Sequence, residues 1–342
     1  MRTTIKDIAR IAGVNISTVS RSLHGSILVA EKTRKKILKI AEELDFEFNS
    51  SAQNLITKNT NIIGIIYPGD LDDFALGMFL SSMLTKIREE LEKKSHFAIM
   101  APPENNYSKL SNIKKMINGG YVDGLIIINW MISKEDWDCI IKKNVPHIFL
   151  HHIPNKYSDR STLVVNDNYV GGVLAAKYLI SLGHKSIFCI ASKGKGKEFK
   201  NRIEGYFSEL KKNKMEDNQS NIVFGECTFD FAYNQTLKME KELKNKKYSA
   251  IFALSDAMAL GVLKACNTMG INIPGDLSLL GYDGHEIGNI IYPQLTTIKQ
   301  PVDALVKEGC SCLINQISNK KIDIKKILIP PSIIEGESCR EI

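Results

Sequence analysis

Long apolar runs are absent from this sequence of 342 residues. No segment approaches the roughly 18 consecutive apolar residues that a membrane-spanning helix needs. Residues 1–7 contain neither an apolar run nor a small-residue cleavage site, so they do not resemble a secretory signal peptide. We therefore expect the protein to stay in the cytoplasm.

Cysteine patterns typical of zinc sites or disulfide frameworks are also absent. The 7 cysteines are scattered from Cys139 to Cys339, and only Cys310 and Cys312 lie close together. A lone C-x-C pair is a weak metal signal, and no Cys/His spacing suggests zinc. We expect reduced thiols that are mostly buried, and no bound metal.

Catalytic signatures are missing as well. The sequence contains no G-x-S-x-G or H-E-x-x-H motif and no cysteine with an evident histidine partner. Gly194 and Gly196 lie in a basic run that lacks the phosphate-loop pattern, which favours a flexible basic loop. His151 and His152 follow a predicted strand without a metal-ligand partner at useful spacing, which favours structural or rim histidines. We predict a protein that is not an enzyme and needs no cofactor.

Positive charge is concentrated near the N-terminus. The net charge is +7, and residues 1–60 hold 10 Lys and Arg against 6 Asp and Glu. Such a cluster suggests a polyanionic partner, although a solvated helical face would give the same count.

The N-terminal residues show the pattern of three short amphipathic helices. Residues 5–12 form the first, with Thr4 as its cap, and Gly13 suits the left-handed end of a helix. A second helix follows over 16–23, and a third begins near Glu31. The residues expected to face their common core are Ile5, Ile8, Ala9, Ala12, Val19, Leu23, Ile37, Ile40, Ala41 and Leu44.

The second predicted helix has a small, polar outer face. Ser17, Ser20 and Arg21 lie opposite its apolar side. Small side chains let a helix enter the major groove, where Arg can bond guanine through two contacts. The pattern indicates a helix-turn-helix, and the alternative is a three-helix bundle whose polar face only meets water.

Several motifs in fixed register make the resemblance specific. They are T-I-K-D-I-A from Thr4, S-T-V-S-R from Ser17, and T-R-K-K-I-L-K-I-A-E-E-L from Thr33. These motifs resemble the headpiece of the lactose-repressor (LacI/GalR) family of transcription regulators. The resemblance implies contacts to base edges or DNA phosphates from Thr4, Ile16, Ser17, Thr18, Arg21 and Asn49.

Residues 49–55 resemble the hinge segment of that family, N-x-x-A-x-x-L. The resemblance implies a hinge helix that enters the minor groove, with Ala52 allowing close approach and Leu55 wedged between base pairs. Family members usually carry Pro before the Asn, whereas this sequence has Phe48. Phe48 does not fix the backbone direction as Pro does, so we expect the order of the hinge to differ from that of the family.

Beyond residue 61 the sequence alternates short β-branched runs with amphipathic stretches. This pattern is typical of buried parallel strands joined by crossover helices, and ligands bind at the carboxyl ends of such strands. We predict an N-terminal three-helix helix-turn-helix headpiece followed by an α/β, periplasmic-binding-protein-like core of two doubly wound parallel-sheet lobes. The predicted bounds are 1–48 for the headpiece, 49–60 for the hinge and linker, 61–162 with 292–322 for the first lobe, and 163–291 with 323–342 for the second.

The resemblance also assigns residues to a cleft between the lobes. Asp167 follows the first strand of the second predicted lobe (residues 163–165), Arg202 opens a helix there, and Asp283 ends a later strand. All three occupy the family's effector positions, and an Arg–Asp combination suits a polyol, though also a nucleobase or a phosphate ester. The alternatives are that Asp167 caps a helix, that Arg202 forms a structural ion pair, and that Asp283 bonds turn amides. Ser255 stands where some members carry a ligand-binding Asn, which puts that contact in doubt.

Further cleft residues come from loops. Asp72 and Phe74 lie after the first predicted strand, and Phe229 or Phe231 is a candidate stacking aromatic that register cannot choose between. The acidic residues favour a neutral polyol or a cationic ligand over a phosphosugar. The sequence as a whole predicts a homodimeric repressor of carbohydrate genes that binds pseudo-palindromic operator DNA.

Other readings remain open at this point. The effector could be a non-sugar ligand or a protein corepressor, and the ligand could either release or promote DNA binding. A secreted sugar receptor would need an export signal in place of the headpiece. With no leucine heptads after Pro331, a dimer without an added tetramer tail is expected.

Overall fold

The computed structural model divides the chain into two compact units, Met1–Thr60 and Asn61–Ile342. The division coincides with the predicted start of the core at residue 61. The described residues are 3–23, 26, 28–44, 46, 59–69, 74–128, 132–152, 158–193, 196–215, 220–319, 321–322 and 324–342.

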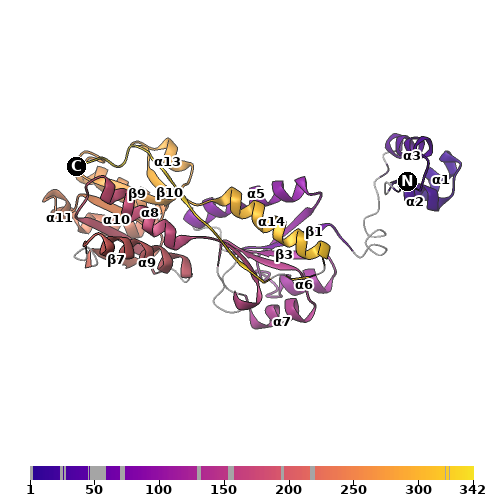
Figure 1. Cartoon of the computed structure of the whole chain (residues 1–342), viewed down its shortest axis with the longest axis horizontal. Helices are drawn as coiled ribbons and strands as arrows, with labels where there is room; N and C mark the ends of the chain where they lie inside the picture. Colours follow the sequence, from indigo (N-terminus) through magenta and orange to yellow (C-terminus); the bar gives the residue numbers. More distant parts are fainter. Residues whose placement is uncertain are drawn as a thin grey trace. The chain divides into compact units, whose positions relative to one another are not determined.

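The described residues of the first unit form α1 (Ile5–Ala12), α2 (Ile16–Leu23) and α3 (Glu31–Glu43) around a small core (Figure 1). Gly13 ends α1 with φ 71°, the left-handed conformation that was expected there. The Lys36 ammonium donates to the Ala12 carbonyl oxygen at 3.0 Å and so satisfies the end of α1. The predicted core is confirmed, with Ile8, Ala9, Ala12, Val19, Ile37, Ile40 and Ala41 buried and Ile5, Leu23 and Leu44 partly buried against them.

The second unit contains two six-stranded sheets, each the centre of one lobe. The first sheet has the order β11-β5-β4-β3-β1-β2 and is parallel throughout. Its strands are β1 (Ile62–Ile66), β2 (Phe97–Ala101), β3 (Gly124–Ile127), β4 (His147–Leu150), β5 (Thr162–Asn166) and β11 (Lys326–Ile329).

Helices cover both faces of the first sheet. One face packs against α5 (Phe74–Lys93) and α14 (Val302–Asn319), which lie side by side in Figure 1. The other face packs against α6 (Asn112–Asn118) and α7 (Lys134–Lys142). Strands buried on both faces explain the continuous apolar runs in the sequence. A short 3₁₀ turn, η1 (Ser158–Arg160), precedes β5.

The second sheet has the order β12-β10-β9-β8-β6-β7, and only β12 runs antiparallel to its neighbour. Its strands are β6 (Ile187–Ser192), β7 (Ile222–Gly225), β8 (Ala250–Ala253), β9 (Ser278–Asp283), β10 (Thr296–Lys299) and β12 (Ser332–Ile334). Its helices are α8 (Asn168–Ser181), α9 (Lys197–Lys212), α10 (Phe229–Lys238), α11 (Glu240–Lys244), α12 (Asp256–Met269) and α13 (Ile287–Ile290).

Three strands lie in the other lobe from the one predicted. β5 pairs with β4 and β11, so the first lobe extends past residue 162. β10 belongs to the second sheet and β11 to the first, so the predicted segments 292–322 and 323–342 each contain a strand of the opposite lobe. The reason is physical: a short apolar run shows that a strand is buried, but not in which of two similar sheets.

The chain therefore crosses between the lobes three times. It passes from β5 to α8 at Asp167, from β10 to α14 at Gln300 and Pro301, and from β11 to β12 at Pro330 and Pro331. The Asp167 amide donates to the Ile329 carbonyl oxygen at 2.9 Å, which ties the first of these crossovers to the third.

All seven cysteines are free thiols, as expected, and four of them are buried. Burial raises the pKa of the Cys266 and Cys310 thiols to about 12, so both are protonated and unreactive at neutral pH. Among the described residues, no helix combines the length and apolar character that crossing a membrane requires.

Candidate DNA interface and ligand site

The outer face of α2 is exposed in the pattern that DNA reading would need. Ile16 is 46% exposed, Ser17 and Arg21 are also exposed, and Val19 on the opposite side is fully buried. Thr18 and Ser20 are partly buried. The outer face of α2 thus exposes one apolar, one small polar and one cationic side chain to solvent.

Thr4 caps α1, as predicted, through a tight contact with Asp7. Its backbone N–H donates to Asp7 Oδ2 at 3.0 Å, and its hydroxyl donates to the same oxygen at 2.7 Å. These hydrogen bonds lower the pKa of the Asp7 carboxyl. Both donors of Thr4 are thus engaged with Asp7, so a phosphate contact by Thr4 requires that it exchange one of them.

Several predicted site residues lie outside the described residues. They include Asn49, Ala52 and Leu55 of the hinge, together with Phe48 and Asp72. Phe74 begins α5, but its side chain is not among those described.

Arg202 is the centre of a buried polar cluster at the carboxyl edge of the second sheet. It lies in the second turn of α9, rather than opening that helix as predicted, and is 3% exposed. Its Nε donates to Asn168 Oδ1 at 2.8 Å, and its Nη1 donates to the Leu254 carbonyl oxygen at 2.8 Å. The guanidinium carbon stands 3.7 Å from the centre of the Tyr282 ring, a cation–π contact.

Asp283 ends β9, as expected, and faces Arg202. Its Oδ1 lies 3.5 Å from Arg202 Nη1 and accepts a hydrogen bond from Gln300 Nε2 at 2.8 Å. Its φ is 128°, a conformation that costs a non-glycine residue on the order of 1–3 kcal/mol. The ion pair predicted as an alternative for Arg202 is present, although at 3.5 Å it is longer than a tight charge-assisted hydrogen bond.

Asp256 is a second buried carboxyl beside this pair. Burial, and then the negative charge of Asp283, raise its pKa to about 8. It accepts hydrogen bonds from the Thr297 hydroxyl at 2.6 Å and the His285 amide at 2.8 Å. Asp256 is therefore mainly protonated at neutral pH.

Asp167 and Ser255 both act as helix caps. Asp167 accepts from the Val170 amide at 3.1 Å at the start of α8, which is the alternative role considered for it. Ser255 accepts from the Met258 amide at 3.2 Å at the start of α12. A ligand contact by either residue would have to use its remaining hydrogen-bonding capacity.

The two candidate aromatics have different surroundings. The Phe231 ring covers the backbone of Gly225 so closely that a Cβ there would overlap it, and the ring packs against the core of the second lobe. Phe229 begins α10 and stacks on Tyr233, with ring centres 6.1 Å apart. Phe229 therefore remains the better candidate for stacking on a ligand.

Sequence reasoning missed an aromatic and histidine cluster between the lobes. The His151 ring lies 4.3 Å from the Phe79 ring of the first lobe, and His285 of the second lobe lies 6.2 Å from Phe79. His152 Nδ1 and Glu198 Oε1 are 2.9 Å apart and bridge β4 to α9. Adjacent histidines after a strand were the available signal, but they were interpreted as structural or rim residues.

His151 is buried in an unusual state. It is 5% exposed, has φ 71°, and its Nδ1 has no hydrogen-bond partner among the described residues. Burial, followed by the nearby His152 and Arg202, holds its pKa well below the ordinary value for histidine, so the ring is neutral. A neutral imidazole can offer both a hydrogen-bond donor and an acceptor.

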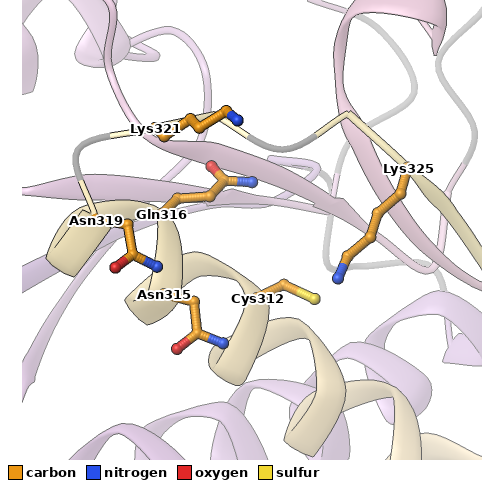
Figure 2. A pocket seen from close by; sticks show the side chains of 6 residues that line it. All are labelled: Cys312, Asn315, Gln316, Asn319, Lys321 and Lys325. Atoms are coloured by element: carbon orange, nitrogen blue, oxygen red, sulfur yellow. The ribbon is translucent and has the colours of Figure 1, made fainter.

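A separate cavity of about 510 Å³ lies at the C-terminal end of α14 (Figure 2). Gln316 in its wall accepts from the His147 amide and donates to the Thr162 hydroxyl, at the first residues of β4 and β5. The cavity is therefore at the amino edge of the first sheet, away from the carboxyl edges where ligands bind. Its lining residues are Cys312, Asn315, Gln316, Asn319, Lys321 and Lys325.

Comparisons with protein families agree with this architecture. Residues 4–49 match the family model described as bacterial regulatory proteins, lacI family, and residues 176–339 match a periplasmic binding protein-like domain. The chain is 30% identical to the transcriptional regulator MalR of Clostridium butyricum over 342 residues, which covers 98% of both chains. It is 28% identical to the transcriptional repressor PurR of Vibrio atlanticus, again over 98% of both chains.

Solved structures show the same fold. The lac repressor dimer bound to operator and the anti-inducer ONPF has a TM-score of 0.78 at 24% identity, covering 99% of this chain and 100% of that one. A LacI family regulator from Enterococcus faecium with bound ribose has a TM-score of 0.68 at 25% identity, covering 82% of this chain and 99% of that one.

Proposed function

The chain belongs to the LacI family of DNA-binding transcription repressors, and from that premise we propose that it is a homodimeric repressor of carbohydrate genes controlled by a sugar bound between its lobes. The observation that carries the sugar proposal is the buried Arg202–Asp283 pair at the carboxyl edge of the second sheet. Members of this family are regulators, so the chain is not an enzyme.

The sugar is favoured by the chemistry of the pair. Arg202 supplies planar donors and Asp283 supplies acceptor oxygens, a combination that bonds neighbouring hydroxyl groups. Because Arg202 and Asp283 balance each other, a neutral ligand leaves no uncompensated buried charge. The relative from Enterococcus faecium was solved with ribose, which is consistent with a small neutral polyol.

A purine base is the second candidate, favoured by the similarity to PurR. The rings of Phe79, His151 and His285 cluster between the lobes and suit a planar heterocycle as well as the apolar face of a sugar. A protein corepressor remains the third option, and nothing in the described residues favours it.

We place the operator contacts on α2. Ile16 and Ser17 would contact base edges near the start of the helix, and Arg21 would bond guanine from its next turn. Further DNA contacts would hold α2 in this register, and they would come from Thr4, Thr18, Ser20 and Asn49. Ala52 and Leu55 of the hinge would act in the minor groove.

Exposed apolar side chains support the dimer. Phe97 on the edge strand β2 is 74% exposed, and Ile290 and Tyr292 on the second lobe are 83% and 87% exposed. Large apolar side chains in such exposed positions are typical of surfaces that a partner covers, and we assign these to a second copy of the chain.

Two experiments test the proposed function. Purified full-length protein is used to select sites from a random DNA pool, and enrichment of a two-fold symmetric site is the expected result. Thermal unfolding is then recorded with ribose, cellobiose, maltose, hypoxanthine and guanine, because a bound ligand raises Tm. Stabilisation by a sugar alone supports the sugar proposal, and stabilisation by a purine alone would replace the sugar with a purine as the effector. A folded protein that enriches no DNA site would contradict the proposed repressor function.

A further inference from the structure

Five side chains form a closed ring of hydrogen bonds at the carboxyl edge of the second sheet. Arg202 Nε donates to Asn168 Oδ1 at 2.8 Å, and Asn166 Nδ2 donates to the same oxygen at 3.2 Å. Asn166 Nδ2 also lies 3.1 Å from the Tyr282 hydroxyl and 3.4 Å from Gln300 Oε1, so its two hydrogens are shared among three acceptors. Gln300 Nε2 donates to Asp283 Oδ1 at 2.8 Å. Arg202 Nη1 closes the ring on Asp283 at 3.5 Å.

The ring joins the ligand pair to two of the three crossovers. Asn166 ends β5 in the first sheet, immediately before the crossover at Asp167. Gln300 follows β10 of the second sheet, immediately before α14 returns to the first lobe. A change in the angle between the lobes must rotate the backbone near these crossovers, so it must also move Asn166 relative to Gln300.

We propose that Asn166 and Gln300 are positioning residues that transmit the state of the Arg202–Asp283 pair to the crossovers. The inference rests on the proposed function in placing the ligand at this pair, but the hydrogen-bond ring itself does not depend on which ligand binds. Gln300 is the key member, because its amide group is bonded to Asp283 on one side and to Asn166 on the other.

The ring is not fully satisfied in this arrangement. Asn166 is 3% exposed, and its Oδ1 is buried without a hydrogen-bond partner among the described residues. An unsatisfied buried acceptor costs stability, and the Arg202–Asp283 and Asn166–Gln300 distances are long for hydrogen bonds of their kinds. A ligand hydroxyl or a different lobe angle that supplied a donor to Asn166 would relieve this cost, which gives the ring two alternative states.

The test exchanges the donor and acceptor at one link. In Gln300→Glu a carboxylate faces the Asp283 carboxylate, so the link is replaced by repulsion. Adding Asp283→Asn restores the link, since the new amide can donate to the new carboxylate and the new carboxylate can balance Arg202. The net charge of the double variant equals that of the wild type.

Hydrogen exchange of the full-length protein without ligand or DNA provides the measurement. The reporters are the Asp167 amide, bonded to the Ile329 carbonyl oxygen, and the Gln300 amide, bonded to the Asp283 carbonyl oxygen at 3.1 Å. Gln300→Glu should raise exchange at both crossovers at least about 10-fold, while amides in the centres of the two sheets change far less. The double variant should return exchange to within about 3-fold of wild type, since paired residues couple in such a cycle.

Gln316→Glu is the matched control, because Gln316 is equally buried and hydrogen-bonded but lies in the first lobe outside the ring. It should leave both crossover reporters unchanged. The proposal is overturned if the double variant exchanges like Gln300→Glu, or if the single variant raises exchange uniformly across the chain. These outcomes are independent of the DNA and ligand experiments, so failure of the ring and failure of the proposed function are distinguishable.

Discussion

Arg21 shows how much of the headpiece follows from single residues. The apolar spacing around Val19 orients α2, and that orientation leaves Arg21 on the outside, where structure and sequence agree. Arg202 and Asp283 are different, because they are 81 residues apart and only the family resemblance predicted that they would meet. Gln300 and Asn166 were not predicted, since neither residue belongs to a motif that marks a buried network.

Arg21→Ala should weaken binding to the selected operator by about 10- to 100-fold, because a bidentate contact to guanine is worth roughly 1–3 kcal/mol. It should also relax the preference at one base pair of each half-site. Fluorescence anisotropy with the operator and with single-base variants measures both effects. Lys39→Ala, an exposed α3 residue paired with Glu43, is the control, and an equal loss in the two variants would contradict base reading by Arg21.

The raised pKa of Asp256 predicts that the contribution of this residue to stability falls as the pH rises. Its pKa is about 8 in the folded protein and near the ordinary value of 3.8 when unfolded, so the folded state binds more protons between these limits. Asp256 therefore makes its full contribution to the free energy of unfolding below about pH 4. This contribution falls as the pH rises towards 8, by at most about 1.4 kcal/mol per pH unit.

Asp256→Asn should remove this contribution, because an amide does not titrate. Urea unfolding of both proteins from pH 4 to 8 gives the difference in stability, which cancels groups common to both, such as His151. The wild-type stability should fall relative to that of the variant as the pH rises. A difference that is constant across this range would show that Asp256 is ionised in the folded state.

At the scale of elements, the contact between α8 and α9 positions Arg202. A Cβ on Gly172 would overlap the Arg202 carbonyl oxygen, and a Cβ on Gly205 would overlap the Tyr169 carbonyl oxygen. The two helices thus approach backbone to backbone beside Arg202. The glycines were visible in the sequence, but their role depends on which helices cross, and a single sequence does not reveal that.

Gly172→Ala should push α9 away from α8, destabilise the protein by about 1–3 kcal/mol, and weaken ligand binding by displacing Arg202. Thermal unfolding and calorimetric titration with the ligand found by the stability screen measure the two effects. Gly288→Ala, whose Cβ would come no closer than 3.3 Å to Leu295, is the control. Unchanged ligand affinity in Gly172→Ala would contradict the positioning of Arg202 by this contact.

The strand assignments belong to the same scale. Residues 163–165 were predicted as the first strand of the second lobe, because an apolar run followed by a capped helix looks alike in either sheet. The pairing of β5 with β4 depends on contacts that no local pattern encodes. The His152–Glu198 bridge was missed for the same reason, since its partners come from different lobes.

At the scale of the whole molecule, two headpieces are needed to reach a two-fold symmetric operator. Phe97→Glu should place a charge on the edge strand β2 and shift the protein from dimer to monomer in analytical ultracentrifugation. Operator affinity should fall with it, because each headpiece then binds alone. Lys142→Glu, at an exposed polar position on α7 of the first lobe, should leave the dimer intact. A dimeric Phe97→Glu protein would exclude this edge from the interface.

The central claim is that one ligand in the cleft sets the affinity of the headpieces for DNA. It is tested most directly by measuring the Kd for the selected operator with and without a saturating concentration of the sugar that raises Tm. If sugar binding and DNA binding are coupled, the sugar should change the Kd for the operator by about 5- to 150-fold, in either direction. An operator Kd that is the same at every sugar concentration, with the sugar demonstrably bound, would contradict the claim.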